Sequence, residues 1–300
     1  MKQTRITDNI TYLEPDSMVL LQTCAGLIID GQRKIFLDVG MGARENTALL
    51  QKEAPDLAVI SHYHFDHSTW LTQVRECSAA TIYVPEAEVQ YLTSLEYAIA
   101  KTGGGLGQTG YWTDQVVSAG YRTVDSPLSY GEDFSIFSDA SLRIEPILTP
   151  GHSPGHSCFY FPQEKILFCG DMGADRFGPW YGWCDCNLQA YVTSLLKLMT
   201  LDVKLLLSSH GGLIADGINE IWTRCIAQIA ARERKVEIGL NGGMSKAQIV
   251  AQGLFYPASV HVDGPQYTMI NMCESAIFDQ HRDLLEAGGL KAQFPELQFV

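Results

Sequence analysis

The sequence predicts an α/β fold of the α+β type, in which a β-rich part, residues 1–216, precedes a helical part, residues 217–300, packed onto it. Short apolar runs bounded by turn residues recur as far as residue 207, which is typical of buried strands. Residues of the kind that bind metals follow several of these runs. Beyond residue 217 the strand pattern stops and helical periodicity takes over.

The composition is that of a globular chain with a sizeable core, because 46% of its 300 residues are hydrophobic and 18% are charged. A net charge of −13 without a lysine or arginine cluster argues against a nucleic-acid partner. The first eight residues lack the apolar core of a signal peptide, and no stretch is long enough to span a membrane. We therefore expect a cytoplasmic protein without a membrane partner, whose eight cysteines are reduced.

The first predicted strands are short apolar runs, two of which are separated by an Asp30-Gly31 hairpin turn. These runs lie at residues 18–21, 26–29, 34–40, 57–60 and 81–84, with a helix expected at 46–53. Asp38 is a polar residue at the end of a buried run. It either supports the metal-binding residue types that follow the run at 57–60, without binding a metal itself, or makes an ordinary strand-end turn.

Residues from about 86 to 126 form an aromatic and glycine-rich insertion into this pattern. Its first half has helical composition, and its glycine run at 102–110 is not followed by the Gly-Lys-Ser/Thr of a phosphate-binding loop. We expect a mobile segment that places Tyr111 and Trp112 over a pocket.

Strands resume after the insertion and give way to helices near Gly217. Further strands are predicted at residues 133–137, 142–148, 158–161, 165–169 and 203–207. Helices are predicted at residues 187–199, 219–238 and 267–287, with a short one opened by the capping-box pattern at 245–248.

Metal-binding residue types cluster where predicted strands end. Four of them occur within six positions directly after the run at 57–60: His62, His64, Asp66 and His67. Asp171 and His210 each follow another predicted strand, and His152 lies in a glycine- and proline-rich turn. Imidazole nitrogen and carboxylate oxygen are preferred ligands of zinc and its first-row neighbours. The sequence therefore predicts a metal site at one edge of a sheet.

These segments together resemble the metallo-β-lactamase superfamily. The shared motifs are His-x-His-x-Asp-His at 62–67, Thr-Pro-Gly-His-Ser-Pro-Gly-His at 149–156, Gly-Asp at 170–171 and Ser-His-Gly at 209–211, in the family's order. The resemblance runs from about residue 18 to 212. It implies an αββα sandwich, two mixed β-sheets flanked by helices, with a binuclear metal site at one sheet edge and a helical C-terminal extension.

The resemblance also implies the role of each ligand. One divalent ion would be held by His62, His64 and His152 and a second by Asp66, His67 and His210, with Asp171 bridging them. Zinc is expected ahead of iron or manganese. A hydroxide held between such ions is a strong nucleophile, and Asp66 could orient it and pass a proton to the leaving group. His156 matches a second histidine of the turn segment that supports the ligands.

Two departures from the family bear on the substrate. Many members follow the first motif with a small residue and two glycines, whereas this chain has Ser68-Thr69-Trp70, which puts the side chain of Trp70 into the substrate pocket where others leave room. The acyl-homoserine lactonases carry a tyrosine three residues after the bridging aspartate, whereas this chain has Ala174, so that role is missing unless Tyr160 or Tyr181 takes it. The Gly-Asp and Ser-His-Gly segments with a helical C-terminus look like a thioesterase branch that includes glyoxalase II and the quinolone-signal response thioesterases.

Aromatic residues near the bridging aspartate predict an apolar pocket for an acyl or aromatic group of a small-molecule substrate. Beside Tyr111 and Trp112, its lining would come from Trp180, Tyr181 and Trp183. Ordinary core packing explains any one of these equally well. The C-terminal helices could cap this pocket, form a homodimer interface, or both.

The sequence thus predicts a metal-dependent hydrolase of a small ester-like bond, with a thioester or lactone ahead of an amide or phosphate. A phosphodiesterase of the same fold is an alternative, although RNA-cleaving members need a basic track. A mononuclear iron persulfide dioxygenase is another, because its ligands overlap with this set. A regulatory binding protein with weak hydrolase activity is the third.

Overall fold

The computed structural model describes residues 1–19, 21–132, 135–140, 142–260 and 267–297. Within these residues, seven strands form the first sheet in the order in which they occur along the chain. Neighbouring strands are antiparallel from β1 to β4 and parallel from β4 to β7. The strands are β1 (Lys2–Arg5), β2 (Ile10–Glu14), β3 (Gly26–Asp30), β4 (Lys34–Leu37), β5 (Leu57–Val59), β6 (Thr81–Pro85) and β7 (Leu128–Tyr130).

The second sheet has five described strands in the order β12-β11-β10-β9-β8. Strands β10 and β11 are parallel, and the other neighbours are antiparallel. Their bounds are β8 (Glu145–Leu148), β9 (Ser157–Phe161), β10 (Ile166–Phe168), β11 (Leu205–Ser208) and β12 (Gly212–Ile214).

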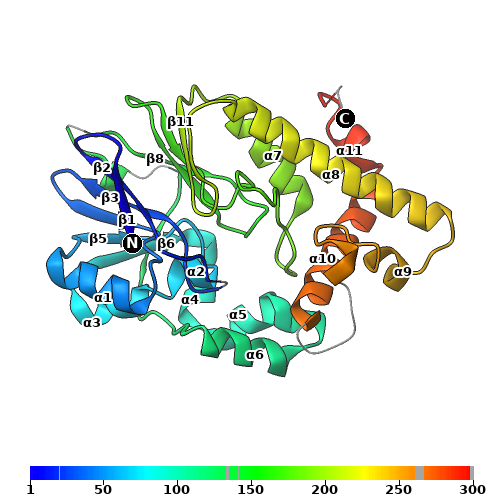
Figure 1. The fold of residues 1–300 in the computed structure, drawn as a ribbon, viewed down its shortest axis with the longest axis horizontal. Coiled ribbons are helices and arrows are strands. Elements are labelled where there is room, and N and C mark those ends of the chain that lie inside the picture. Colours follow the sequence, from blue (N-terminus) through cyan, green and yellow to red (C-terminus); the bar gives the residue numbers. More distant parts are fainter. Residues whose placement is uncertain (20, 133–134, 141, 261–266, 298–300) are drawn as a thin grey trace.

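The two sheets pack face to face over one apolar cluster. Leu27 and Leu37 of the first sheet belong to the same buried cluster as Phe159 and Phe168 of the second. The outer faces are covered by helices, with α1 and α3 against the first sheet and α7 and α8 beside the second (Figure 1). The predicted sandwich of two mixed sheets flanked by helices is confirmed.

Two of the helices predicted from the sequence begin at capping residues. Asn187 accepts a hydrogen bond from the Ala190 backbone N–H at the start of α7, and Ser245 with Gln248 forms the predicted capping box of α9. In the C-terminal part, α10 packs against α7, α8, α9 and α11. The bounds are α1 (Ala43–Lys52), α2 (Phe65–Ser68), α3 (Leu71–Cys77), α7 (Leu188–Leu198), α8 (Ile218–Asn241), α9 (Lys246–Val250), η4 (Ala258–Val260), α10 (Thr268–Glu286) and α11 (Gly289–Gln293).

The insertion between β6 and β7 is helical and packed. It contains η1 (Glu86–Glu88), α4 (Val89–Thr93), α5 (Leu95–Lys101), η2 (Gly103–Leu106) and α6 (Thr109–Ser118). A Cβ atom on Gly103 would lie 2.8 Å from Met272 and 2.9 Å from Trp112, so this glycine permits close packing against α10. Trp112 is fully buried and its indole N–H donates to Thr102. It therefore belongs to the core and does not cover an open pocket.

Some expected strands are wrong, and others were missed. Met18 and Val19 are exposed and outside any strand, and Leu21 has a φ of 62°, which an extended strand does not allow. Residue 20 lies outside the described residues. Of the strand expected at 133–137, residues 133–134 are also outside them, and the remainder forms the 3-10 turn η3 (Ser135–Phe137). Strands β1, β2, β7 and β12 were not predicted, and most of them are short strands at or near sheet edges.

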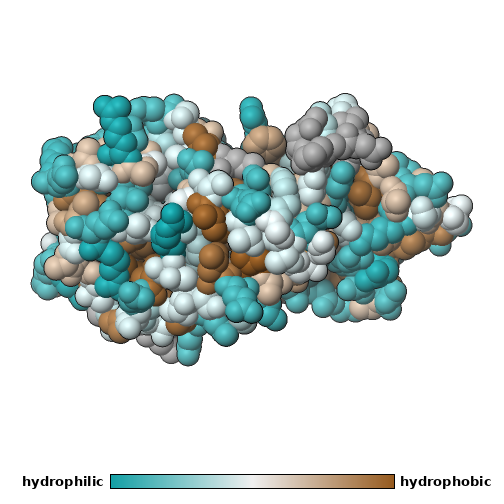
Figure 2. Space-filling view, turned by 90° about the horizontal axis from the view of Figure 1, so that it is seen from below, coloured by the Kyte–Doolittle hydropathy of each residue, from teal (hydrophilic) through white to brown (hydrophobic). Residues whose placement is uncertain are grey.

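The described part of the chain contains no helix with the length and apolar character needed to cross a membrane. All eight cysteines are free thiols, as predicted. The face seen in Figure 2 is mainly hydrophilic, with a short strip of hydrophobic residues near its middle.

Candidate metal centre

The predicted ligands come from both sheets and meet at one edge. His62 lies three residues beyond the end of β5, Asp171 follows β10 and His210 follows β11. Because β10 and β11 are parallel and adjacent, their carboxyl ends present Asp171 and His210 side by side. His152 comes from the loop between β8 and β9.

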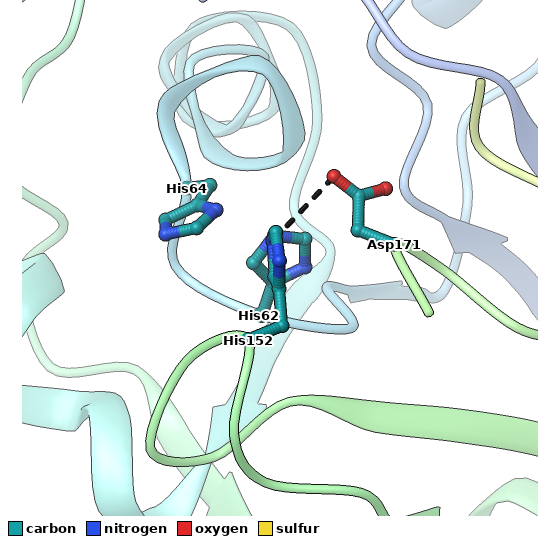
Figure 3. Close-up of side chains that lie close together, drawn as sticks. All are labelled: His62, His64, His152 and Asp171. Atoms are coloured by element: carbon teal, nitrogen blue, oxygen red, sulfur yellow. Dashed lines mark ion pairs between the residues drawn. The ribbon is translucent and has the colours of Figure 1, made fainter. Parts of the chain in front are cut away.

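The first group of ligands consists of His62, His64, His152 and Asp171, whose ligand atoms all lie within 4.8 Å of one another. Figure 3 shows these side chains pointing toward a common centre, from the loop beside α2, the β8–β9 loop and the end of β10. His152 Nε2 lies 3.6 Å from Asp171 Oδ2. Three imidazoles and one carboxylate are a suitable coordination set for a divalent metal.

The second group consists of Asp66, His67 and His210 and meets the same distance limit. His210 Nε2 lies 3.2 Å from Asp66 Oδ2 and 3.3 Å from Asp171 Oδ2. The other carboxylate oxygen of Asp171 lies 3.3 Å from His67 Nε2. Asp171 therefore lies between the two groups and contacts histidines of both.

The buried ligand atoms fit a metal because they lack other partners. The Nε2 atoms of His62, His64, His67 and His152 and Oδ1 of Asp171 are buried and make no hydrogen bond in the described part of the chain. Burying such atoms without a partner is unfavourable, and five of them converge here. Divalent cations would satisfy these lone pairs, so the residues present fit the metal that the motifs imply.

The centre is closed on one side and open on the other. The side chains of His62 and His67 are 0% exposed, whereas those of Asp66, Asp171 and His210 are 15%, 14% and 25% exposed. A substrate would therefore approach from the side of Asp66 and His210. An accessible position is characteristic of a catalytic site and not of a structural one.

Hydrogen bonds to the other ring nitrogen fix the orientation of three histidines. His67 Nδ1 lies 2.8 Å from Asp38 Oδ2, and His62 Nδ1 lies 2.9 Å from the hydroxyl of Ser61. His152 Nδ1 lies 2.9 Å from the carbonyl oxygen of Trp180. Each contact leaves Nε2 facing the centre, which is how supporting residues usually orient metal-binding histidines.

His156 supports Asp171 through the backbone. Its Nδ1 lies 2.8 Å from the Thr149 hydroxyl, and its Nε2 accepts a hydrogen bond from the Asp171 N–H over 3.1 Å. A Cβ on Gly170 would lie 2.5 Å from His156 Nε2, so glycine is required before Asp171. His156 is therefore placed as a supporting residue and not as a member of either ligand group.

The electrostatics of the site suit a bound cation. Burial lowers the pKa of His62 and of His64 well below the usual value, so both imidazoles are neutral and can donate a lone pair. Burial alone would raise the pKa of Asp171, but the adjacent His210 and His67 hold it well below its usual range. The carboxylate is thus ionised within the ligand cluster.

Of the aromatic residues predicted to line a pocket, one lies against the ligands and several belong to the core. Trp180 is half-buried, and its ring centroid lies 5.8 Å from that of His64 and 5.5 Å from that of His152. Trp183 is buried between Trp180 and Trp112. Of the predicted aromatics, Trp180 is the one in ring contact with the ligands.

Trp70 and Tyr111 take packing positions. Trp70 is 1% exposed, and its indole N–H donates to the His67 carbonyl over 2.7 Å, so it supports the ligand loop and does not narrow the substrate path. Tyr111 is half-buried on α6 and packs against the main apolar cluster.

Tyr181 and Tyr160 do not replace the lactonase tyrosine. The Tyr181 hydroxyl is buried 2.9 Å from His281 Nε2 and accepts from Arg232 over 3.0 Å. The Tyr160 hydroxyl donates to the Asp202 carbonyl. Both hydroxyls are therefore engaged away from the ligands. Of the two histidines outside the motifs, His281 has a packing role and His261 lies outside the described residues.

His281 makes the stability of the fold depend on pH. Burial, with a contribution from nearby Arg232, lowers the pKa of His281 from 6.5 to about 3. The unfolded chain therefore binds a proton below pH ~6.5 that the folded chain rejects, and stability falls as the pH falls, by about 1.4 kcal/mol per unit. Between pH 7 and 5 we expect wild type to lose about 2 kcal/mol more than His281→Gln in urea unfolding. Equal losses would contradict this assignment.

Several residues that organise the centre have no role predicted from the sequence. Ser61 directly precedes the first motif, and its N–H and hydroxyl both donate to Asp38. Its position next to His62 is the feature of the sequence that could have indicated this role. Glu88 and the carbonyl of Trp180 contact ligand loops distant in sequence, and no local pattern indicates such contacts.

Comparison with known proteins places the chain in a family. The sequence model of the metallo-beta-lactamase superfamily matches residues 19–210, well over half of the chain, and this range contains both ligand groups. This chain belongs to the metallo-β-lactamase superfamily. It is accordingly a metal-dependent hydrolase with its ligand cluster assembled.

Several relatives of the superfamily are similar in sequence. "Probable metallo-hydrolase YqgX" of Bacillus subtilis is 29% identical over 191 residues, covering 62% of this chain and 82% of that protein. "Lactamase-like protein nscB" of Trichophyton equinum is 28% identical, covering 67% and 51%. "Thioesterase pkgB" of Emericella nidulans is 25% identical, covering 74% and 55%. The matches span about half the length of these fungal relatives.

Solved structures of metallo-β-lactamase proteins share the fold over nearly the whole chain. A family protein from Thermus thermophilus aligns with a TM-score of 0.74 at 20% identity, covering 94% of this chain and 95% of that one. A beta-lactamase domain protein from Burkholderia ambifaria gives 0.75 at 19%, covering 96% and 89%. At this identity the likeness establishes the fold alone.

Proposed function

We propose that this metallo-β-lactamase protein holds two divalent ions, zinc ahead of iron or manganese, and hydrolyses a small thioester. The observation that carries the proposal is the position of Asp171, whose two oxygens contact His67 on one side and His210 and His152 on the other. Ions bound there would supply Lewis acidity for the substrate carbonyl and for water.

The chain's own residues account for binding and proton transfer. Asp66 is partly exposed beside His210 on the open side, where its carboxylate can accept a proton from water and pass it to the leaving thiolate. The half-buried indole of Trp180, against His64 and His152, offers an apolar surface for the acyl or aromatic group.

Two observations rank a thioester above the rivals. The tyrosine that lactonases use is replaced by Ala174, and Tyr160 and Tyr181 are bonded elsewhere. A thioester has a good leaving group, so its hydrolysis depends less on a tyrosine hydroxyl. A net charge of −13 without a cationic cluster disfavours nucleic-acid phosphodiesters such as RNA, which need a basic track. The similarity to "Thioesterase pkgB" supports the same order.

The direct test is thiol release from a panel of acyl-CoA and acyl-glutathione thioesters by apoprotein reconstituted with zinc, manganese or iron. We expect metal-dependent release that His64→Ala lacks. Absence of release with every metal, together with cleavage of a lactone or a phosphodiester, would overturn the thioester assignment. Metal-dependent consumption of oxygen with a persulfide would favour the iron dioxygenase.

Replacing Trp180 by alanine should raise KM for aromatic acyl thioesters roughly tenfold, because about 1.5 kcal/mol of apolar contact is lost. kcat should change less, since the carbonyl that holds His152 belongs to the backbone and remains. Trp180→Phe keeps an aromatic wall and should restore most of the affinity. Steady-state kinetics with an aromatic and a two-carbon acyl group tests this. An unchanged KM for both would remove Trp180 from the pocket.

A further inference from the structure

A buried carboxylate outside the ligand motifs lies between the two loops that form the first ligand group. Glu88 is the last residue of η1, directly after β6 and before α4, and it is 0% exposed. Acidic residues are rarely buried without partners, because the loss of hydration is costly. Its contacts must therefore offset that cost.

All of the described hydrogen bonds to Glu88 come from the ligand loops. Its Oε2 accepts from the backbone N–H of Tyr63 over 2.6 Å, and Tyr63 lies between His62 and His64. Its Oε1 accepts from the backbone N–H of Gly155 over 2.8 Å and from the hydroxyl of Ser153. Ser153 directly follows His152 in sequence. One carboxylate thus joins two loops that are about 90 residues apart along the chain.

The loop around His152 is shaped to approach this carboxylate. A Cβ on Gly155 would lie 2.8 Å from both Glu88 Cγ and Pro85 Cβ, closer than real contacts allow. Glycine at this position therefore lets the backbone N–H reach Oε1. The close contact with Glu88 thus depends on glycine at position 155, which argues that this contact is an integral part of the site.

We propose that Glu88 is a positioning residue that fixes the spacing between His62 and His64 on one loop and His152 on the other. It thereby sets the metal affinity of the first ligand group. The inference rests on metal binding at this group, as in the proposed function, but not on the identity of the substrate. Glu88 acts on the ligand side chains through the two backbones that it holds.

The isosteric variant Glu88→Gln tests this spacing. A backbone N–H faces each carboxylate oxygen, so the amide NH2 of glutamine must meet one of these donors in either orientation. The variant therefore loses one of the two backbone contacts, while the volume of the side chain stays the same. We expect zinc affinity, measured by competition with a chromophoric chelator, to fall about 10- to 100-fold, as is typical for residues that support metal ligands. Turnover at limiting zinc should fall in parallel and recover at high zinc.

Glu274→Gln is the matched control. Glu274 is also 0% exposed, and its carboxylate accepts three backbone N–H groups, those of Leu254, Phe255 and Tyr256. It lies on α10, and the segment that it holds, residues 254–256, contains none of the metal ligands. We expect both variants to lose stability to urea, but Glu274→Gln to bind zinc as wild type does. Equal zinc affinities of Glu88→Gln and wild type, or equal losses in the two variants, would overturn the proposal.

A milder variant keeps the test decisive if Glu88→Gln does not fold. Ser153→Ala removes one donor to Oε1 and leaves both backbone contacts, so a folded protein with zinc affinity reduced several-fold is expected. An unchanged affinity would contradict the positioning role. Because the readout is zinc binding, wild type that binds zinc but cleaves no thioester would refute the proposed substrate without affecting this inference.

Discussion

Replacing Asp171 by alanine should lower kcat/KM for a thioester by about 10³-fold or more, because the carboxylate that contacts histidines of both ligand groups is lost. Asp171 contacts His67, His210 and His152 within 3.6 Å. Without its charge, two ions in adjacent ligand groups would have no shared anion between them. We therefore expect less than two equivalents of metal to remain after dialysis.

Asp171→Asn is the matched control for this prediction. Asparagine keeps the shape, one carbonyl oxygen and the backbone N–H that donates to His156, but it removes the charge. We expect an intermediate loss of activity and metal. Thiol release and metal analysis on the same samples measure both effects. Two retained equivalents and near-normal turnover in Asp171→Ala would contradict the bridging role.

Replacing Asp38 by alanine should damage both stability and metal binding. Asp38 is 0% exposed, and it pairs with the Ser61 N–H at 2.7 Å, the Ser61 hydroxyl and His67 Nδ1 at 2.8 Å. Its loss leaves these buried groups unsatisfied, which should lower the free energy of unfolding by about 3 kcal/mol or more. Since His67 also loses its orientation, we expect metal affinity to fall about 10- to 100-fold.

Asp38→Asn separates the two effects of this substitution. Asp38 has a φ of 50°, a conformation that asparagine also tolerates, and asparagine still offers one acceptor. We expect a smaller loss of stability than in Asp38→Ala and a clear loss of metal affinity. Urea unfolding and chelator competition measure these separately. If Asp38→Ala were as stable as wild type, the support assigned to Asp38 would be wrong.

The clustering of these metal-binding residue types could be predicted because most of them follow a strand that the sequence reveals. The runs before His62, Asp171 and His210 are continuous and apolar, as expected for buried strands that end at one edge. Strands of three residues such as β7 and β12 contain too few positions to show a period. Their existence depends on pairing with neighbours distant in sequence.

The aromatic surroundings of the ligands could be predicted only in part. Trp112 and Trp180 both occur in aromatic segments, but Trp112 is buried because Gly103 lets α10 pack closely against the insertion. Trp180 stays at the ligands because its carbonyl holds His152. Neither contact has a local sequence signal. The contacts of Glu88 were hidden for the same reason, since its donors lie 25 and more residues away.

The most direct test of the account is a zinc titration of the apoprotein in which thioester turnover is recorded at each step. A centre with two ligand groups joined by Asp171 predicts turnover that keeps rising until two equivalents of zinc are bound per chain. Full turnover at one equivalent, or no turnover at two equivalents with zinc, manganese or iron, would contradict it.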